Sequence, residues 1–392
     1  MKVKKNKKIS IAFIFGTRPE TIKMYPVIKE ARKYPELVKP IIILSGQHRE
    51  MMDQMIKLFK IHPDFDLNIM KHGQSLSKIN SQLLIKLEKV LQKSQPDIVL
   101  VQGDTTTTFS GALAAFYQKI KVGHIEAGLR TAKKYYPYPE EMNRRLTTVL
   151  ADYHFAPTKN AVQDLLKEGV TKDKIFLSGN TVIDALMLMQ DKGFLFSNNR
   201  INNAIASGKK LLLVTMHRRE NWGESLVNLS RALLKIIDKH TNMVIVFPIH
   251  KNPKIRNIVF KYLQKEESII LSEPLDYQEM ANIMSLSTLV LTDSGGIQEE
   301  APALGKPVLI LRTETERPEV VKIGAAKLVG TTTENIEKEI ERLLLNQAEY
   351  KKMVINKSPY GDGQAAKRIL EYILYQYNIS KSPPFEYIYD SD

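Results

Sequence analysis

Residues 9–33 read ISIAFIFGTRPETIKMYPVIKEARK, and this stretch decides the fold class. An apolar run from Ile9 to Phe15 leads into a glycine turn, and an amphipathic pattern follows from Glu20 to Lys33. A strand, a tight turn and a helix in this order form the repeating unit of a parallel sheet covered by helices. No small-residue cleavage site follows the apolar run. The run therefore predicts a buried first strand rather than a signal peptide.

The same alternation continues along most of the chain. In the first half it predicts strands at 38–45, 97–102, 122–125, 153–156 and 175–177, with helices at 47–59, 76–92, 106–117 and 139–150. A polar stretch at 194–209 predicts a connection, and strands are predicted after it at 210–216, 243–247, 268–271, 288–291 and 307–311. The pattern at 353–377 predicts a helix, followed by a frayed tail.

Two such series predict an α/β fold with two Rossmann-like, doubly wound domains and an interdomain cleft that holds the ligand. We expect an N-terminal domain over residues 1–180, a C-terminal nucleotide-binding domain over 181–364 and a tail over 381–392. Doubly wound sheets bind ligands outside the carboxyl ends of their strands. Polar residues that follow predicted strands are therefore the first candidates for a site.

The composition narrows the possible partners. The chain contains no cysteine, which excludes disulfides and thiolate chemistry and suits a cytoplasmic protein. The formal charge of +14 favours an anionic partner, but the lysines are scattered, so we expect a small anion and no nucleic acid. No apolar run of about 18 residues predicts a membrane span. No zinc-site spacing or G-x-G-x-x-G loop is present, so neither a metal nor a cofactor is expected.

The first predicted strand is followed by a candidate anion site. Gly16 frees backbone N–H groups, Arg18 offers a planar donor fork, and Lys23 lies one turn into the helix. An ordinary strand-to-helix turn explains the glycine alone. Two cations at the positive end of a helix favour anion binding instead.

Three carboxylates follow neighbouring predicted elements: Asp104, Glu126 and Glu140, with Arg144 four residues after Glu140. Taken singly, each is explained as a helix cap or as half of a helix-bracing ion pair. Together at adjacent strand ends they would crowd one another and shift their pKa values. This crowding predicts acid–base chemistry.

Phosphate chemistry is indicated in the second half. His217 and Arg218 follow one predicted strand, and Ser294, Gly295 and Gly296 follow another at the start of a helix. A hydroxyl and glycine amides at a helix N-terminus suit a diphosphate. Two further polar residues, Glu300 and Arg317, lie close by in the sequence.

Taken together, these clusters resemble the non-hydrolysing UDP-N-acetylglucosamine 2-epimerases, in family order from Ile9 to about Gly363. The matching stretches are GTRPETIKM, SGQH, GDTTTT, GHIEAGLRT, PYPEEMNR, GNTVIDAL, HRRENWG, TDSGGIQEEAP and ERPE. The resemblance implies an isomerase of polysaccharide biosynthesis that interconverts UDP-N-acetylglucosamine and UDP-N-acetylmannosamine at carbon 2. It implies no cofactor, a homodimer, and an architecture like that of the GT-B glycosyltransferases, with a C-terminal helix at about 365–380 that returns to the first domain.

The resemblance also implies roles for single residues. The catalytic residues would be Asp104, Glu126, Glu140 and His217. The residues binding UDP and the sugar would be Arg18, Lys23, Arg144, Ser294, Gly295, Gly296, Glu300 and Arg317, with a uracil pocket around Leu275 and Met280. These last two positions often hold a Gln and an aromatic residue in the family.

Members of the family often bind a second sugar nucleotide as an activator beside the active site. The residues that match this second site are Gln47, His48, Arg218 and His250. Glu50 and Gly73 stand where a Gln and an Arg are expected. This departure predicts that activator binding is altered or lost.

Three other functions compete with this interpretation. A hydrolysing 2-epimerase would release free N-acetylmannosamine and UDP, although hydrolysing relatives usually differ in the GDTTTT stretch. A UDP-sugar glycosyltransferase of the same architecture would leave the three carboxylates without a role. A basic binding protein on a Rossmann scaffold would bind nucleic acid with a steep salt dependence and turn over no sugar nucleotide.

Overall fold

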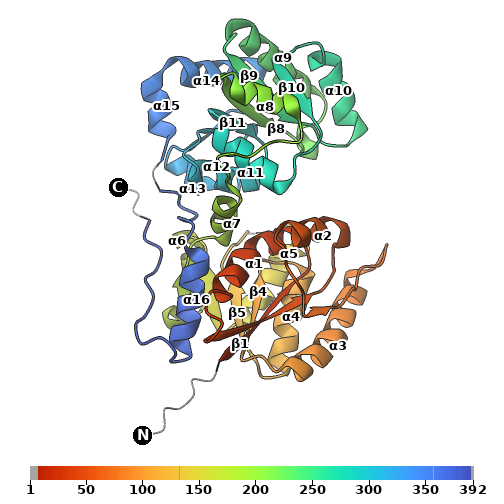
Figure 1. Ribbon diagram of the computed structural model, residues 1–392, viewed down its shortest axis with the longest axis vertical. Helices are drawn as coiled ribbons and strands as arrows, with labels where there is room; N and C mark the ends of the chain where they lie inside the picture. Colours follow the sequence, from red (N-terminus) through yellow and green to blue (C-terminus); the bar gives the residue numbers. More distant parts are fainter. Residues whose placement is uncertain (1–7, 132, 356, 390–392) are drawn as a thin grey trace. The chain divides into compact units, whose positions relative to one another are not determined.

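The computed structural model describes residues 8–131, 133–355 and 357–389, and the chain divides into two compact units (Figure 1). Unit 1 contains the residues up to Ala185 together with Tyr360–Ile388, and unit 2 contains Leu186–Pro359. The chain therefore leaves unit 1 once and returns to it once along this length.

Unit 1 is built on a parallel sheet. Its strands within the described residues are β1 (Ile9–Phe15), β2 (Val38–Leu44), β3 (Phe65–Asp66), β4 (Ile98–Gln102), β5 (Lys121–Ile125), β6 (Tyr153–Ala156) and β7 (Ile175–Leu177). They lie in the order β3-β2-β1-β4-β5-β6-β7. The register between β1 and β2 runs from Ile9 opposite Val38 to Phe15 opposite Leu44. All of β1 except Ser10 is buried, as expected for a strand covered on both faces.

Helices cover this sheet in two groups. The helices of unit 1 are α1 (Arg18–Ala31), α2 (Arg49–Leu58), α3 (Leu76–Ser94), α4 (Thr106–Tyr117), α5 (Glu140–Leu150), α6 (Lys159–Lys167), α7 (Thr181–Met189, which continues into unit 2) and α16 (Ala365–Gln376). In the first group, α4 lies between α3 and α5. In the second group, α1 packs against α2 and α16 (Figure 1). Ala12 and Ile14 of β1 belong to the apolar core shared with α3 and α4.

Unit 2 repeats the design with a second parallel sheet. Its strands are β8 (Lys210–Thr215), β9 (Met243–Pro248), β10 (Ile269–Ser272), β11 (Leu289–Thr292), β12 (Val308–Ile310) and β13 (Ala326–Leu328), in the order β10-β9-β8-β11-β12-β13. Its helices are α8 (Asn199–Ala206), α9 (Glu224–Lys239), α10 (Pro253–Leu263), α11 (Tyr277–Leu286), α12 (Gly295–Ala303), α13 (Pro318–Lys322), α14 (Thr333–Leu345) and α15 (Gln347–Met353). The predicted α/β class with two doubly wound parallel sheets is confirmed.

Both sheets reverse their strand order at one place. In unit 1 the reversal lies between β1 and β4, and in unit 2 it lies between β8 and β11. In doubly wound proteins, ligands bind at the carboxyl end of the sheet at such a reversal, where the loops diverge to opposite sides. The loops after these four strands and the helices they lead into carry half of the candidate residues.

Two predictions of secondary structure are wrong. The polar stretch at 194–209 contains helix α8, because Asn198 accepts a hydrogen bond from the Arg200 N–H and so caps a helix that the composition alone did not indicate. The helix predicted over 353–377 occupies only Ala365–Gln376, because the preceding helix α15 ends at Met353 and α16 begins at Ala365.

The prediction of a frayed tail is also wrong for the described residues around Tyr387, which pack in unit 1. Tyr387 is only 4% exposed, and its N–H donates to the Leu177 carbonyl at 2.7 Å. The guanidinium of Arg368 lies 5.1 Å from the centre of its ring, and Glu386 pairs with Lys172. Because β7 is an edge strand, a segment that covers it satisfies backbone groups that would otherwise be open to another chain.

Within the described part of the chain, no helix combines the length and the apolar composition that a membrane crossing requires.

Candidate functional site

The loop after β1 is shaped by a close approach of backbone and a helix cap. A Cβ atom on Gly16 would lie 1.6 Å from the Ser45 hydroxyl oxygen, so only glycine fits there. Thr17 caps α1, and Glu20 completes a reciprocal capping box with it. Arg18 is the first helical residue and is half-buried. The sequence therefore places a guanidinium at the positive end of a helix beside the strand reversal.

Glu20 ties this loop to the loop after β4, a role that sequence reasoning missed. Its side chain is buried, and one oxygen accepts the N–H groups of Gly16 at 2.9 Å and Thr17 at 2.8 Å. The other oxygen accepts the hydroxyl of Thr105, the residue that caps α4, at 2.6 Å. Burial raises the pKa of Glu20, and these hydrogen bonds oppose that rise. The acidic residue after a Gly-Thr-Arg-Pro turn was the signal for this role.

Asp104 lies at the end of β4 and contacts α5. Because Thr105 is the N-cap of α4, the helix does not use the Asp104 side chain as its cap. The Asp104 carboxylate pairs with the Arg144 guanidinium at 2.6 Å, and its backbone carbonyl accepts the Asn143 amide at 3.0 Å. Both partners come from α5, so this helix fixes the loop that carries Asp104.

The pKa of Asp104 shows the effect of the neighbouring charges that the sequence predicted. Burial raises the pKa of Asp104, Arg144 and Lys23 lower it, and the charges of Glu126 and Glu140 raise it. The balance is a pKa above the ordinary value. A shift in this direction makes the carboxyl group a stronger proton acceptor than an ordinary aspartate.

Glu126 is held in an unusual backbone conformation. Its φ is +65°, in the left-handed region that residues with a side chain rarely adopt, and its side chain is buried. Lys23 donates to both carboxylate oxygens at 2.5 and 2.6 Å, Gln102 donates to one of them, and Asn180 donates to the other at 3.2 Å. Backbone strain at a buried, tightly held carboxylate is typical of a functional residue.

Two further residues, Glu140 and His124, lie near the loop that carries Asp104. Glu140 is the first residue of α5 and is half-buried, whereas its neighbour Glu141 is fully buried and pairs with Arg145 at 2.8 Å. His124 bonds the Gly103 carbonyl at 2.7 Å, and burial lowers its pKa to about 3. A histidine with this pKa stays neutral and supports the loop before Asp104 rather than exchanging protons.

In unit 2, a buried aspartate organises the loop after β8. Asp293 accepts the N–H groups of His217 at 3.0 Å and Arg218 at 2.9 Å, and the Asn221 amide at 3.0 Å. The His217 ring nitrogen Nδ1 lies 3.3 Å from the same carboxylate, and the His217 side chain is 46% exposed. Asp293 therefore orients the ring while leaving much of it accessible.

The N-terminus of α12 is surrounded by cationic side chains. Ser294 is the N-cap, and no side chain caps the helix there. A Cβ atom added to Gly295 would lie 3.9 Å from a terminal nitrogen of Arg218 and equally far from one of Arg317. Glu316 pairs with Arg218 at 3.5 Å. Burial raises the pKa of Glu316, but the neighbouring arginines have the larger combined effect, so its pKa is below the ordinary value. Two guanidinium groups, each also paired with a glutamate, Glu316 or Glu299, therefore stand beside the positive end of this helix.

The remaining predicted residues fall into one unit or the other. Unit 1 brings Lys23, Asp104, Glu126, Glu140 and Arg144 into mutual electrostatic range. Unit 2 carries the remaining nucleotide and activator candidates, Leu275, Met280, Gly296, Glu300 and His250. Glu300 is buried in α12, and the two uracil candidates are half-buried at α11. Among the described residues, no group of three or more acidic or histidine side chains could hold a metal ion.

Of the predicted activator residues in unit 1, Gln47 has a clear structural contact. Its side-chain oxygen accepts the backbone N–H of Thr107 at 3.1 Å and the Thr107 hydroxyl at 2.7 Å. His48 lies next to it and is exposed. Gln47 therefore links the loop after β2 to α4.

Comparison with known proteins agrees with this geometry. The family model described as UDP-N-acetylglucosamine 2-epimerase matches residues 29–374. The UDP-N-acetylglucosamine 2-epimerase of Bacillus subtilis strain 168 is 48% identical over 378 residues, which cover 96% of this chain and 98% of the relative. The enzyme of the same name from Escherichia coli K12 is 48% identical over 370 residues, which cover 93% and 98% of the two chains.

A solved structure shows the same similarity. The crystal structure of UDP-GlcNAc 2-epimerase from Neisseria meningitidis bound to UDP-GlcNAc has a TM-score of 0.80 and 47% identity. The match covers 94% of this chain and all of that one. With a family model that spans most of its length and relatives close to half identical end to end, this chain belongs to the UDP-N-acetylglucosamine 2-epimerase family.

Proposed function

We propose that this protein interconverts UDP-N-acetylglucosamine and UDP-N-acetylmannosamine by elimination and re-addition of UDP, without hydrolysis. The observation that carries the proposal is the cluster of Asp104, Glu126 and Lys23 at the carboxyl ends of β4 and β5. Proton transfer requires acid–base groups with suitable pKa values. Asp104 and Glu126 interact electrostatically, and the pKa of Asp104 is raised.

The chemistry explains why more than one carboxyl group is needed. The hydrogen on carbon 2 of the sugar is only weakly acidic, so we infer that its removal accompanies departure of UDP from carbon 1. A carboxylate takes the proton, the C1–O bond breaks with its electron pair leaving on UDP, and a carbon–carbon double bond forms. Protonation of carbon 2 from the opposite face and return of UDP to carbon 1 then give the epimer. Removing and delivering a proton on two faces calls for at least two acid–base groups, for which Asp104, Glu126 and Glu140 are the candidates.

The nucleotide half of the reaction is assigned to unit 2. Departure of a diphosphate is fast only where its growing negative charge is held. Ser294, Gly295 and Gly296 at the start of α12 supply amide dipoles, and the guanidinium groups of Arg218 and Arg317 flank Gly295. In this proposal His217 contacts the phosphates, and Glu300 binds the ribose.

Retention of the intermediate distinguishes the proposal from hydrolysis. The stretch GDTTTT, residues 103–108, favours the non-hydrolysing reaction, because hydrolysing relatives usually differ there. The hydrolysing reaction is the second candidate and differs in its products. The cytoplasm stays the expected location.

Product analysis tests the reaction type. Proton NMR of the purified protein with UDP-N-acetylglucosamine in D₂O is expected to show UDP-N-acetylmannosamine with deuterium at carbon 2, because the abstracted proton exchanges with solvent. Free N-acetylmannosamine with stoichiometric UDP would establish the hydrolysing reaction instead. An epimer that retains its original hydrogen would exclude proton transfer at carbon 2.

Substitution of the carboxylates tests their role. Asp104→Asn and Glu126→Gln are each expected to lower kcat by at least ~10²-fold, the usual contribution of an acid–base group. Asp164→Asn, which removes a half-buried carboxylate on α6 of the same unit that pairs with Lys167, is the matched control and should retain wild-type kcat. Rates within a few fold of wild type for both active-site variants, with unchanged circular dichroism, would reassign the two carboxylates as structural.

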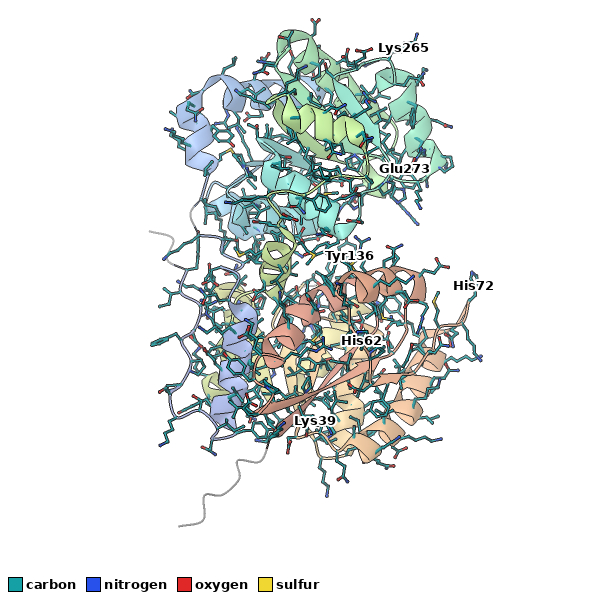
Figure 2. The ribbon with its side chains drawn as sticks, viewed as in Figure 1. Lys39, His62, His72, Tyr136, Lys265 and Glu273 are labelled. Atoms are coloured by element: carbon teal, nitrogen blue, oxygen red, sulfur yellow. The ribbon has the colours of Figure 1, made fainter. Side chains whose placement is uncertain are left out.

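The activator prediction is tested in the reverse direction. Glu50 lies exposed in the first turn of α2, and Gly73 follows the exposed His72, which is labelled in Figure 2. Neither offers the amide and guanidinium donors that the family places there. Initial rates with UDP-N-acetylmannosamine alone should therefore show no lag and little stimulation by UDP-N-acetylglucosamine. A strict requirement for added UDP-N-acetylglucosamine would contradict this prediction.

A homodimer is also proposed, on the evidence of an uncovered apolar face. The α4 sequence TTTFSGALAAFY contains no charged residue, although Phe116 is 56% and Tyr117 is 63% exposed. On the adjacent α5, Leu146 is 41% and Val149 is 83% exposed. Exposed apolar side chains on two helices that pack against each other favour an association surface. A second copy of the chain that presents the same face would cover them.

Light scattering coupled to gel filtration tests the dimer. The wild-type chain should elute with twice the monomer mass, and the double variant Phe116→Glu/Val149→Glu should elute as a monomer because it would bury four charges in the interface. Leu345→Glu, at an exposed apolar position on α14 in unit 2, is the matched control and should leave the mass unchanged. A wild-type monomer, or a double variant that stays dimeric, would contradict the proposed surface.

A further inference from the structure

Asn180 occupies the place where the chain leaves unit 1. It follows β7 in the loop 178–180 and immediately precedes α7, and the unit ends five residues later at Ala185. The chain re-enters unit 1 at Tyr360. The Asn180 N–H donates to the Tyr360 carbonyl at 2.6 Å, so the exit and the return are hydrogen-bonded to each other within unit 1.

The two segments are in close backbone contact at this point. A Cβ atom on Gly179 would lie 3.4 Å from the Gly361 Cα, and one on Gly361 would lie 3.5 Å from the Asn180 nitrogen. Both glycines have positive φ, +84° and +144°. One turn further along α7, the Asp184 carboxylate accepts the N–H groups of Ala365 at 3.2 Å and Ala366 at 2.8 Å. The exit and return segments therefore form one fastened unit.

The Asn180 side chain points from this fastening to the candidate catalytic carboxylate. It is 3% exposed, its amide nitrogen donates to Glu126 Oε1 at 3.2 Å, and its amide oxygen accepts the Val182 N–H at 3.1 Å. The bond to Val182 fixes which end of the amide faces Glu126, because the oxygen must lie toward the N–H and the nitrogen toward the carboxylate.

We infer that Asn180 is a positioning residue for the proposed reaction: its amide sets the orientation of the Glu126 carboxylate and ties that orientation to the two segments that connect the units. Lys23 and Gln102 hold the same carboxylate from α1 and β4, which belong to the body of unit 1. Asn180 is the donor that comes from the connection. The inference rests on the proposed function, since it assigns Asn180 a part in proton transfer by Glu126.

Asn180 carries no charge, and this affects the protonation of Glu126 as much as the position of its amide does. Charged groups that act on Glu126 include Lys23 from α1, which pairs with it, and Asp104 from the loop after β4, which feels its charge. A neutral amide adds a hydrogen bond without changing this balance. Asn180→Asp would replace the donor with a second acid beside Glu126, and two carboxyl groups at hydrogen-bond distance hold a shared proton more tightly than either alone.

The inference is tested by the pH dependence of kcat for the full chain, with NMR or coupled detection of the epimer. Asn180→Asp is expected to move the acidic limb of the profile to higher pH by about one unit or more, because the pair loses its shared proton later. Gln102→Glu, which places an acid on the same carboxylate from β4, should move the limb in the same direction. Asn180→Ala should lower kcat about tenfold and leave KM within about twofold, since it removes a hydrogen bond to a charged group and no nucleotide contact.

Asp184→Asn is the matched control. Asp184 fastens the same two segments but does not contact Glu126, and burial raises its pKa to about 7, so the variant also removes an ionisation near neutral pH. The acidic limb of the kcat profile of this variant should stay at the wild-type pH, whatever the loss in kcat, because the variant places no new acid beside Glu126. An unmoved profile for Asn180→Asp together with wild-type kcat for Asn180→Ala would overturn the inference, and so would an equal shift in Asp184→Asn. If Asn180→Asp fails to fold, the kcat and KM of Asn180→Ala decide. A wild-type chain that forms no epimer would instead refute the proposed function.

Discussion

A buried carboxylate stands beside the strand reversal of each sheet, and the arrangement of the loops depends on it. In unit 1, Glu20 accepts backbone N–H groups from the loop after β1 and a hydroxyl from the residue that caps α4. In unit 2, Asp293 accepts backbone N–H groups from the loop after β8 and the amide of Asn221. Removing a carboxylate from water is unfavourable unless donors replace its hydration shell, so each of these acids holds its loops in the one arrangement that supplies the donors.

The two acids support different chemistry because their neighbours differ. Beside the loops that Glu20 joins, unit 1 gathers further acids with Lys23 and Arg144, and burial with mutual repulsion raises the pKa of Asp104. Beside Asp293, unit 2 gathers guanidinium groups around the start of α12. One fold thus yields a site suited to moving protons and a site suited to holding phosphate. The distinction lies in the side chains that follow the strands, not in the sheets.

The sequence predicted the elements with strong local signals. Strands buried on both faces of a parallel sheet are continuous apolar runs, and β1, β6 and β7 begin and end at the predicted residues. The two-residue strand β3 and the strand β13, which carries an exposed lysine, have no such run and were missed. The ordered segment around Tyr387 was missed because an aromatic residue near a chain end gives no local sign of the edge strand that it covers.

The candidate site divides in the same way. Asp104, Glu126 and Ser294 could be predicted because each lies within two residues of the end of a strand. The residues that orient them could not, because their partners are distant in the sequence: Gln102 is 24 residues from Glu126, and Asn180 is 54. The left-handed conformation of Glu126 was equally hidden, since nothing in the letters HIEAG marks a positive φ.

The return of the chain to unit 1 has a consequence for its biosynthesis. Unit 2 is continuous from Leu186 to Pro359, and α16 and Tyr387, which pack in unit 1, are translated after it. At about 5–20 residues per second, the ribosome needs roughly 10–35 s to make the stretch between the two parts of unit 1. During that interval the surface of α1 that α16 covers is open on the nascent chain, so unit 1 cannot complete its fold until unit 2 has been synthesised.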